Sequence, residues 1–272
     1  MTGKELKESL RNGKRVYGTL IVSTSPKWID IIDQLNLDFV FIDTEHIAID
    51  RHQLSWMCHA YAGKGVVPVV RIPSPDPYEA SMVLDGGAKG VVAPYVESVN
   101  EVQQLVGAVK AKPLKGIKLR NYLDGTEDFE PELAKYIEMN NENHVLIINI
   151  ESQPAIDRID EIVKVPGLDA VLIGPHYLTC NLGIPEQYHH LKHEAAVETI
   201  VTKARKANIG AGVHAFYDDN VDQEIAWAKM GANLILHSGD INRFTQIMSN
   251  DINRLRAALN DEVKRSQRTI NI

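Results

Sequence analysis

Residue types that serve in acid–base chemistry stand where several short apolar runs of the sequence end. Asp43, Glu45 and His46 follow the run FVFI. Arg71 follows VVPVV, and Glu151 follows VLIINI. Together they supply carboxylates, a base that titrates near neutral pH and a planar cation. Such a set suits an anionic substrate from which a proton is removed next to a carbonyl group.

Each of these residues also has a structural explanation. The group Asp43-x-Glu45-His46 could form a turn with a helix cap. Glu151 could belong to a structural ion pair. Arginine is seldom buried unless it is paired, so Arg71 is unusual at the end of an apolar strand. We favour a functional role for all of them, because an acid and an imidazole stand together where one strand opens.

A later apolar run ends in the turn Gly174-Pro175, and His176 and Tyr177 follow at once. In parallel α/β folds, ligands bind at the carboxyl ends of the strands. Backbone amides just beyond such a turn can donate hydrogen bonds to an anion. We therefore expect the segment 174–177 to contribute to the same site as the charged residues.

Five further histidines have less specific surroundings. His214 and His237 end two later apolar runs, and each could either face the pocket or be satisfied within a barrel. His189, His190 and His193 form an HHxxH cluster in a polar loop. Because the neighbouring residues of this cluster are polar, we expect it to lie at the surface rather than to hold a metal ion.

Eight short apolar runs, each followed by a helical pattern, organise the chain. They cover residues 16–22, 39–43, 66–72, 91–95, 145–151, 170–174, 210–214 and 234–237. Most are continuous rather than alternating, which is typical of strands buried on both faces. The sequence predicts a single TIM (β/α)8 barrel over residues 1–272, with an open doubly wound sheet as the alternative. No GxGxxG or P-loop motif supports a nucleotide site.

Capping residues and composition add to this description. Ser25, Asp50 and Ser98 are expected to cap helices, and a final amphipathic helix is expected over about 241–264. The net charge of −7 argues against nucleic-acid or anionic-membrane partners. No apolar run reaches the length of a membrane span. With no signal peptide and two unpaired cysteines, Cys58 and Cys180, we expect a reducing, cytoplasmic location.

Five spaced motifs resemble one family over nearly the whole chain. They are FVFIDTEH (39–46), VVRIP (69–73), LDGGAKGVVAPYVES (84–98), IINIES (147–152) and VLIGPHYLTCNLG (171–183). In this order they resemble the HpcH/HpaI aldolases, which are metal-dependent pyruvate aldolases such as the 2,4-dihydroxyhept-2-enedioate and 2-keto-3-deoxyglucarate aldolases. The order and spacing of several motifs make this resemblance more specific than one short motif would.

The resemblance implies a fold and an activity. The fold would be a phosphoenolpyruvate/pyruvate-domain-like (β/α)8 barrel with its site at the carboxyl rim. The enzyme would be a carbon–carbon lyase that cleaves or forms 4-hydroxy-2-oxo acids through a pyruvate enolate, with an aldehyde as the second substrate. A divalent metal ion of the Mg or Mn type would bind pyruvate. Members of the family form homo-oligomers, trimers or hexamers, and the C-terminal helix would take part in assembly.

The resemblance also implies roles for individual residues. His46 would be the general base, acting through a metal-bound water, with Asp43 and Asp85 orienting it. Arg71 would hold the substrate oxygens and stabilise the enolate, and Glu151 would be a metal ligand. The pyruvate carboxylate would bind to the backbone of four residues: Gly174, Pro175, His176 and Tyr177.

One position departs from the family's pattern. The motif GP-x-D-L-S reads here Gly174-Pro175-His176-Tyr177-Leu178-Thr179. Tyr177 thus replaces the aspartate that would be the second metal ligand. A phenol is neutral at pH 7, so we expect weak metal binding, although Glu45 or Asp43 could compensate.

Three hypotheses follow from this departure. The first is an aldolase with a modified metal shell. The second is an enzyme with altered chemistry, such as a metal-independent lyase or a condensing enzyme. The third is a paralogue that only binds a keto acid or a partner protein. The base, the cation and the acid at the strand ends favour an enzyme.

Overall fold

The eight apolar runs form the strands of a closed parallel barrel. The computed structural model describes residues 1–217 and 220–262. The strands are β1 (Val16–Ile21), β2 (Phe39–Asp43), β3 (Val67–Arg71), β4 (Gly90–Ala93), β5 (Val145–Ile150), β6 (Ala170–Ile173), β7 (Gly210–Ala215) and β8 (Leu234–Gly239). Neighbouring strands pair in chain order, and β8 closes on β1. The predicted TIM barrel is confirmed.

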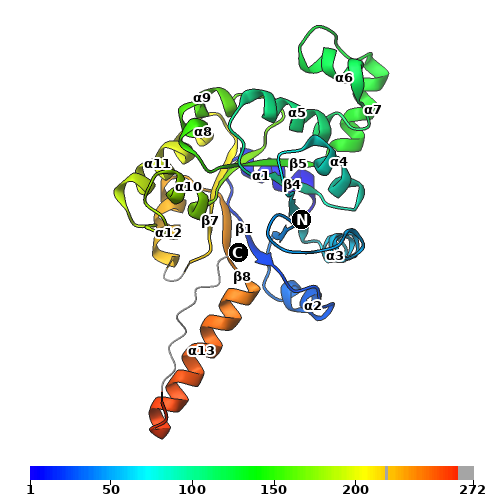
Figure 1. Ribbon diagram of the computed structural model, residues 1–272. Helices are drawn as coiled ribbons and strands as arrows, with labels where there is room; N and C mark the ends of the chain where they lie inside the picture. Colours follow the sequence, from blue (N-terminus) through cyan, green and yellow to red (C-terminus); the bar gives the residue numbers. More distant parts are fainter. Residues whose placement is uncertain (218–219, 263–272) are drawn as a thin grey trace.

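Most of the helices follow strands and cover the outside of the barrel (Figure 1). They are α1 (Gly3–Arg11), α2 (Lys27–Asp33), α3 (Arg51–Gly63), α4 (Pro77–Asp85), α5 (Val99–Lys110), α6 (Gly116–Leu123), α7 (Pro131–Asn141), α8 (Gln153–Asp157), α9 (Ile159–Ile162), α10 (Pro175–Asn181), α11 (Leu191–Lys206), α12 (Val221–Met230) and α13 (Asp240–Leu259). Short, buried, continuous strands need this cover because both of their faces are apolar.

Two of the three expected helix caps are confirmed. The Asp50 side chain accepts a hydrogen bond from the amide of Gln53, and Ser98 forms a capping box with Glu101. The expectation for Ser25 is wrong, because α2 begins one residue later than predicted and Pro26 occupies the position before its first residue.

The amino ends of the strands are closed by α1. Leu6 and Leu10 of this helix are fully buried in the same apolar cluster as the residues that point into the barrel. A Cβ added to Gly210, at the start of β7, would lie 2.8 Å from a methyl carbon of Leu10, so the helix packs directly against this end. The opposite end, where the strands finish, is therefore the one that can receive a ligand.

Three helices extend beyond the compact barrel (Figure 1). The pair α6 and α7 forms a projecting segment between α5 and β5, and α13 projects from the end of β8. The first residue of α13, Asp240, accepts hydrogen bonds from the amides of Val22 and Ser23 and so fixes this helix to β1. The expected end of the final helix, 263–264, lies outside the described residues. No helix of the described ranges is long and apolar enough to cross a membrane.

Candidate active site

A buried ion pair joins the carboxyl ends of β2 and β3. Asp43 and Arg71 are paired in register on adjacent strands, so their side chains point to the same face. Arg71 donates from Nε to Oδ1 of Asp43 at 2.8 Å and from Nη2 to Oδ2 at 2.5 Å. Burial opposes ionisation of Asp43, but the hydrogen bonds and charge of Arg71 hold its pKa below the ordinary value. The ion pair therefore holds a charged guanidinium in a fixed position at the base of the site.

Glu45 and His46 stand beside this pair. Oε2 of Glu45 lies 3.2 Å from Nε of Arg71 and 3.4 Å from Nε2 of His46. Burial raises the pKa of Glu45, and burial together with the charge of Arg71 lowers the pKa of His46. His46 is therefore a neutral imidazole at pH 7, which is the form that can accept a proton.

Glu151 follows β5 and is held from three directions. Its Oε2 accepts a hydrogen bond from the amide of Tyr95, and its Oε1 accepts one from Nδ2 of Asn149, both at 3.0 Å. A Cβ on Gly174 would lie 1.8 Å from Oε1, so glycine is needed there. The side chain is 1% exposed, and burial raises its pKa to about 7.

Two of these contacts were not predicted from the sequence. Asn149 is the polar residue of an otherwise apolar strand, and it stands two positions before Glu151. In a strand, residues two apart point to the same face, so its position was a usable signal. Tyr95 contributes only its backbone amide to Glu151, and side-chain type carries no signal for such a contact.

Tyr177 lies across the mouth of the barrel. It belongs to the first turn of α10, after β6. Its ring is 5.8 Å from the ring of His46, which follows β2, and 6.0 Å from the ring of Tyr95, which follows β4. The His176 ring is a further neighbour at 5.8 Å. Because a residue after β6 contacts residues after β2 and β4, it extends over the site rather than along one wall.

The structure does not bring Asp85 to this site. Asp85 is the last residue of α4, which leads to the amino end of β4. Its exposed carboxylate pairs with Lys112. His46 lies at the carboxyl ends of the strands, on the opposite side of the barrel. The expectation that Asp85 orients His46 is therefore wrong within a single chain, because a short side chain cannot span the length of the strands.

His214 and His237 are divided between the inside and the outside of the barrel. His214 lies 5.3 Å from the ring of Phe41, its buried Nε2 has no hydrogen-bond partner among the described residues, and burial lowers its pKa to about 3. His237 instead pairs with Glu224, Nδ1 to Oε2 at 2.6 Å, and its Nε2 is 3.0 Å from Nη2 of Arg243. Only His214 is near the site.

The HHxxH cluster does not act as one group. His190 accepts a hydrogen bond from the amide of Lys192 at the start of α11. His193 is fully buried, with Nδ1 2.8 Å from the carbonyl oxygen of Tyr188, so a surface position is wrong for this residue. Among the residues that the structure describes, no three His, Cys, Asp or Glu side chains are grouped to hold a metal ion.

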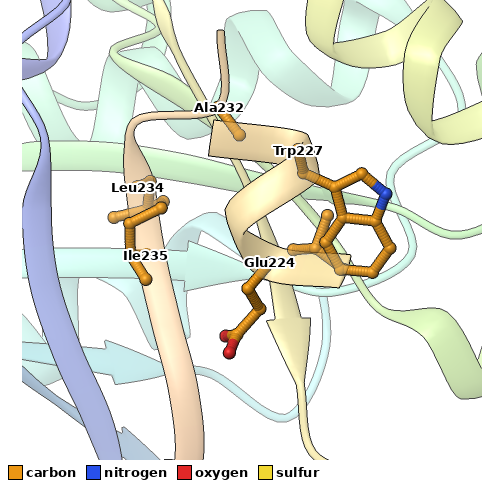
Figure 2. A pocket seen from close by; sticks show the side chains of 6 residues that line it. Glu224, Trp227, Ala232, Leu234 and Ile235 are labelled. Carbon is orange, nitrogen blue, oxygen red and sulfur yellow. The ribbon is translucent and has the colours of Figure 1, made fainter. Parts of the chain in front are cut away.

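A small cavity lies between β8 and α12, and its lining includes none of Asp43, Arg71 and Glu151 (Figure 2). Its volume is about 10 Å³, enough for one water molecule. Its lining is mostly apolar: Val213, Glu224, Trp227, Ala232, Leu234 and Ile235. It is too small for a substrate, and the rim of the barrel remains the candidate site.

The sequence is similar to a family of known proteins over most of its length. A family model described as HpcH/HpaI aldolase/citrate lyase matches residues 17–238. A hydroxypyruvate/pyruvate aldolase of Roseovarius nubinhibens is 28% identical over 240 residues, 88% of this chain and 92% of that protein. A 2-keto-3-deoxy-L-rhamnonate aldolase of Escherichia coli is 29% identical over 229 residues, 84% of each chain.

Solved structures show the same architecture. An HpcH/HpaI aldolase from Desulfitobacterium hafniense superposes with a TM-score of 0.79 at 27% identity, over 92% of this chain and 96% of that one. The citrate synthase SbnG superposes with a TM-score of 0.78 at 26% identity, over 94% of this chain and 99% of that one. The range matched by the family model, 17–238, includes Asp43, Arg71 and Glu151.

Proposed function

The chain belongs to the HpcH/HpaI aldolase/citrate lyase family, and from this premise we propose that it cleaves or forms 4-hydroxy-2-oxo acids through a pyruvate enolate. The observation that carries the proposal is the convergence of a neutral imidazole, His46, and a fixed guanidinium, Arg71, at one rim. The relatives named as aldolases support a lyase with a 2-oxo acid and an aldehyde as substrates.

Arg71 is arranged to receive the oxygens of the 2-oxo acid. Its Nε and Nη2 donate to Asp43, and within the described residues no hydrogen bond uses Nη1. The N–H groups of Nη1 are thus available to the keto oxygen, on which negative charge develops. A donor held in place before the reaction stabilises that charge without reorganisation. Asp43 is assigned to orienting Arg71 rather than His46, because both of its carboxylate oxygens accept hydrogen bonds from the guanidinium.

Proton transfer is assigned to His46. The neutral ring takes a proton from the methyl group of pyruvate, and the electrons of that C–H bond form the enolate. The enolate carbon then bonds to the carbonyl carbon of the aldehyde as the carbonyl π electrons move to its oxygen, and the resulting alkoxide takes the proton held by His46, which returns the ring to its neutral form. Cleavage runs through the same steps in reverse. An imidazole is suited to both directions because its pKa lies near neutral pH.

The carboxylate of the 2-oxo acid is assigned to the start of α10. The first amides of a helix have no acceptor within the helix. Pro175 lacks an N–H group, so His176 and Tyr177 would donate. Gly174 has extended backbone at this point, with φ −91° and ψ 98°. The turn therefore brings two amides to the same rim as Arg71.

The rim does not fit a tightly held divalent metal ion. Both oxygens of Glu151 already accept hydrogen bonds, and the neutral phenol of Tyr177 stands where a second carboxylate is expected. Hard cations such as Mg²⁺ require several oxygen ligands, preferably anionic. We therefore expect any Mg²⁺ or Mn²⁺ to bind weakly, and no step above depends on one.

We propose that α13 mediates assembly of the chain into a homo-oligomer, a trimer or hexamer. Within the described part of this helix only Asp240 is buried. The exposed apolar side chains are Phe244, Ile247, Met248, Ile252, Leu255 and Leu259. A row of exposed apolar side chains on a projecting helix is typical of a subunit interface. A second copy of the chain would cover it.

A condensing reaction is the second candidate. The likeness to the citrate synthase SbnG, at 26% identity over 94% of this chain, favours it. In such a reaction the carbanion partner would also be generated by His46 and stabilised by Arg71. The two candidates differ in the second substrate and share the proton-abstraction step.

Exchange of the pyruvate methyl protons in deuterated buffer tests the shared step without knowledge of the second substrate. We expect the wild-type protein to catalyse exchange, observed by NMR. Removing a donor to the developing oxyanion costs about 100- to 1,000-fold, so Arg71→Ala should lower the exchange rate by at least that factor. Arg120→Ala, on an exposed position of α6, is the matched control for loss of one positive charge. Undiminished exchange in Arg71→Ala would contradict the role of Arg71.

A further inference from the structure

Two tyrosine rings line the entrance to the reactive groups. Tyr177 reaches from the end of β6 to residues after β2 and β4. β3 and β5 lie between these strands in the barrel; β3 ends in Arg71, and Glu151 follows β5. The ring of Tyr177 therefore stands beside the place where the enolate would form. Tyr95 meets it edge-on, with the ring planes 82° apart.

These rings are more exposed than Arg71, Glu45 and His46, the groups assigned to the chemistry. Tyr177 is 36% exposed and Tyr95 is 38% exposed, whereas Arg71 is 6% exposed. A second substrate approaching Arg71 from solvent can thus pack against the rings of Tyr177 and Tyr95. Flat apolar groups gain from such surface by area burial and by edge-to-face or offset contacts.

Tyr95 is held in place before any ligand binds. Its backbone has φ +50°, an uncommon conformation for a residue other than glycine. Its amide donates to Glu151, and its hydroxyl accepts from Nδ2 of Asn181 at 3.3 Å. A side chain that is already ordered loses little conformational entropy when a ligand binds, which favours its use for recognition.

From this geometry we infer that the carbonyl partner of the enolate carries an aromatic or similarly flat apolar group, which packs against Tyr177 and Tyr95. The inference rests on the proposed function and names the substrate class of the same site. Small polyhydroxylated aldehydes would present hydroxyl groups to these rings and would leave the apolar surface without a partner. The recognition belongs to the rings, so a phenylalanine at position 177 retains it.

The test compares benzaldehyde with glycolaldehyde as the acceptor of pyruvate. We expect wild-type kcat/KM to favour benzaldehyde, and Tyr177→Ala to lower this preference about tenfold or more through KM for benzaldehyde. Tyr177→Phe is the matched control and should retain the preference. Tyr95→Leu is a second variant, which keeps apolar volume and removes the ring. Circular dichroism establishes that each variant is folded.

A binding measurement makes the outcome independent of turnover. Saturation-transfer NMR of benzaldehyde in the presence of pyruvate should show at least about fivefold weaker binding to Tyr177→Ala and unchanged binding to Tyr177→Phe. An unchanged preference and unchanged binding in Tyr177→Ala would overturn the inference. Equal losses in Tyr177→Phe and Tyr177→Ala would overturn it too, because the hydroxyl would then be responsible. Absence of pyruvate proton exchange in the wild type overturns the proposed function instead, and the binding data still decide the inference.

Discussion

Glu151 depends on a neighbour that has no side chain. Gly174→Ala places a Cβ 1.8 Å from Oε1 of Glu151, and the carboxylate must move away from Tyr95 and Asn149. We expect a loss of about 1–3 kcal/mol in the free energy of unfolding, as for other overpacked sites, measured by urea titration. Pyruvate proton exchange should fall at least tenfold in the same variant.

Gly63→Ala is the control for this substitution. Apart from its own helix backbone and chain neighbours, no heavy atom of the residues that the structure describes lies within 4 Å of a Cβ at this position, at the end of α3. Alanine in a helix is about 0.5–1 kcal/mol more favourable than glycine, so this variant should be as stable as the wild type or more so. If both variants behave alike, the packing of Glu151 against Gly174 is not what positions it.

A carboxylate at position 177 should restore metal binding. Tyr177→Asp adds a second anionic oxygen ligand next to Glu151, and hard divalent cations bind more tightly as the number of such ligands rises. We expect at least a tenfold gain in Mn²⁺ affinity by isothermal titration calorimetry. Tyr136→Asp, which adds the same charge on exposed α7, is the control and should leave the affinity unchanged. Equal affinities in both variants would show that Tyr177 does not occupy the ligand position.

The site residues were predictable to different degrees. Asp43, Arg71 and Glu151 stand at strand ends, and strand ends follow from apolar runs, so their convergence could be predicted. The raised pKa of Glu151 could not be predicted, since it depends on burial and on hydrogen bonds from residues distant in sequence. Asp85 was assigned to the site by the resemblance. It lies at the end of α4, at the opposite end of the barrel from His46.

At the scale of elements, continuous apolar runs predicted the strands well because a strand buried on both faces needs no alternation. The helix expected after β5 is instead two short helices, α8 and α9. Arg158, between them, has φ −103° and ψ 7°, which interrupts the helical hydrogen bonds. The pattern of apolar residues does not reveal a helix break at a single residue, so the division into α8 and α9 could be seen only in the structure.

The proposed role of the projecting helix α13 in assembly can be tested by changing its apolar face. Phe244→Glu introduces a charge where the side chain is 64% exposed in the single chain and would be buried in an oligomer. Burying an unpaired charge costs several kcal/mol, so we expect a smaller assembly by size-exclusion chromatography with light scattering. Asn250→Glu, on an exposed polar position of the same helix, is the control. The same mass for Phe244→Glu and the wild type would argue against an interface at this position.

At the scale of the whole molecule, a buried histidine couples stability to pH. Burial lowers the pKa of His144 from 6.5 to about 4, and its Nδ1 lies 3.0 Å from Oδ1 of Asn141. Between these pH values the unfolded chain binds a proton that the folded chain does not. This contribution to the free energy of unfolding is therefore present above pH 6.5 and is lost as the pH falls towards 4.

Urea unfolding of wild type and His144→Asn at several pH values measures this contribution. The wild type should lose stability more steeply than the variant between pH 6.5 and 4, by roughly 1 kcal/mol after allowing for partial solvent exposure. His52→Asn, exposed on α3, should follow the wild-type slope. Parallel slopes for wild type and His144→Asn would rule out His144 as the source.

The sequence by itself determined the barrel, the rim that carries the chemistry and most of the charged residues there. These follow from local patterns, because the order of apolar runs sets the strands and parallel strands end at one edge. Only the tertiary structure decided that Tyr177 crosses the mouth, that Asp85 lies at the opposite end and that Glu151 is held by Asn149, Tyr95 and Gly174. Such contacts join residues far apart in the chain, and their geometry arises from packing across the barrel rather than from any local pattern.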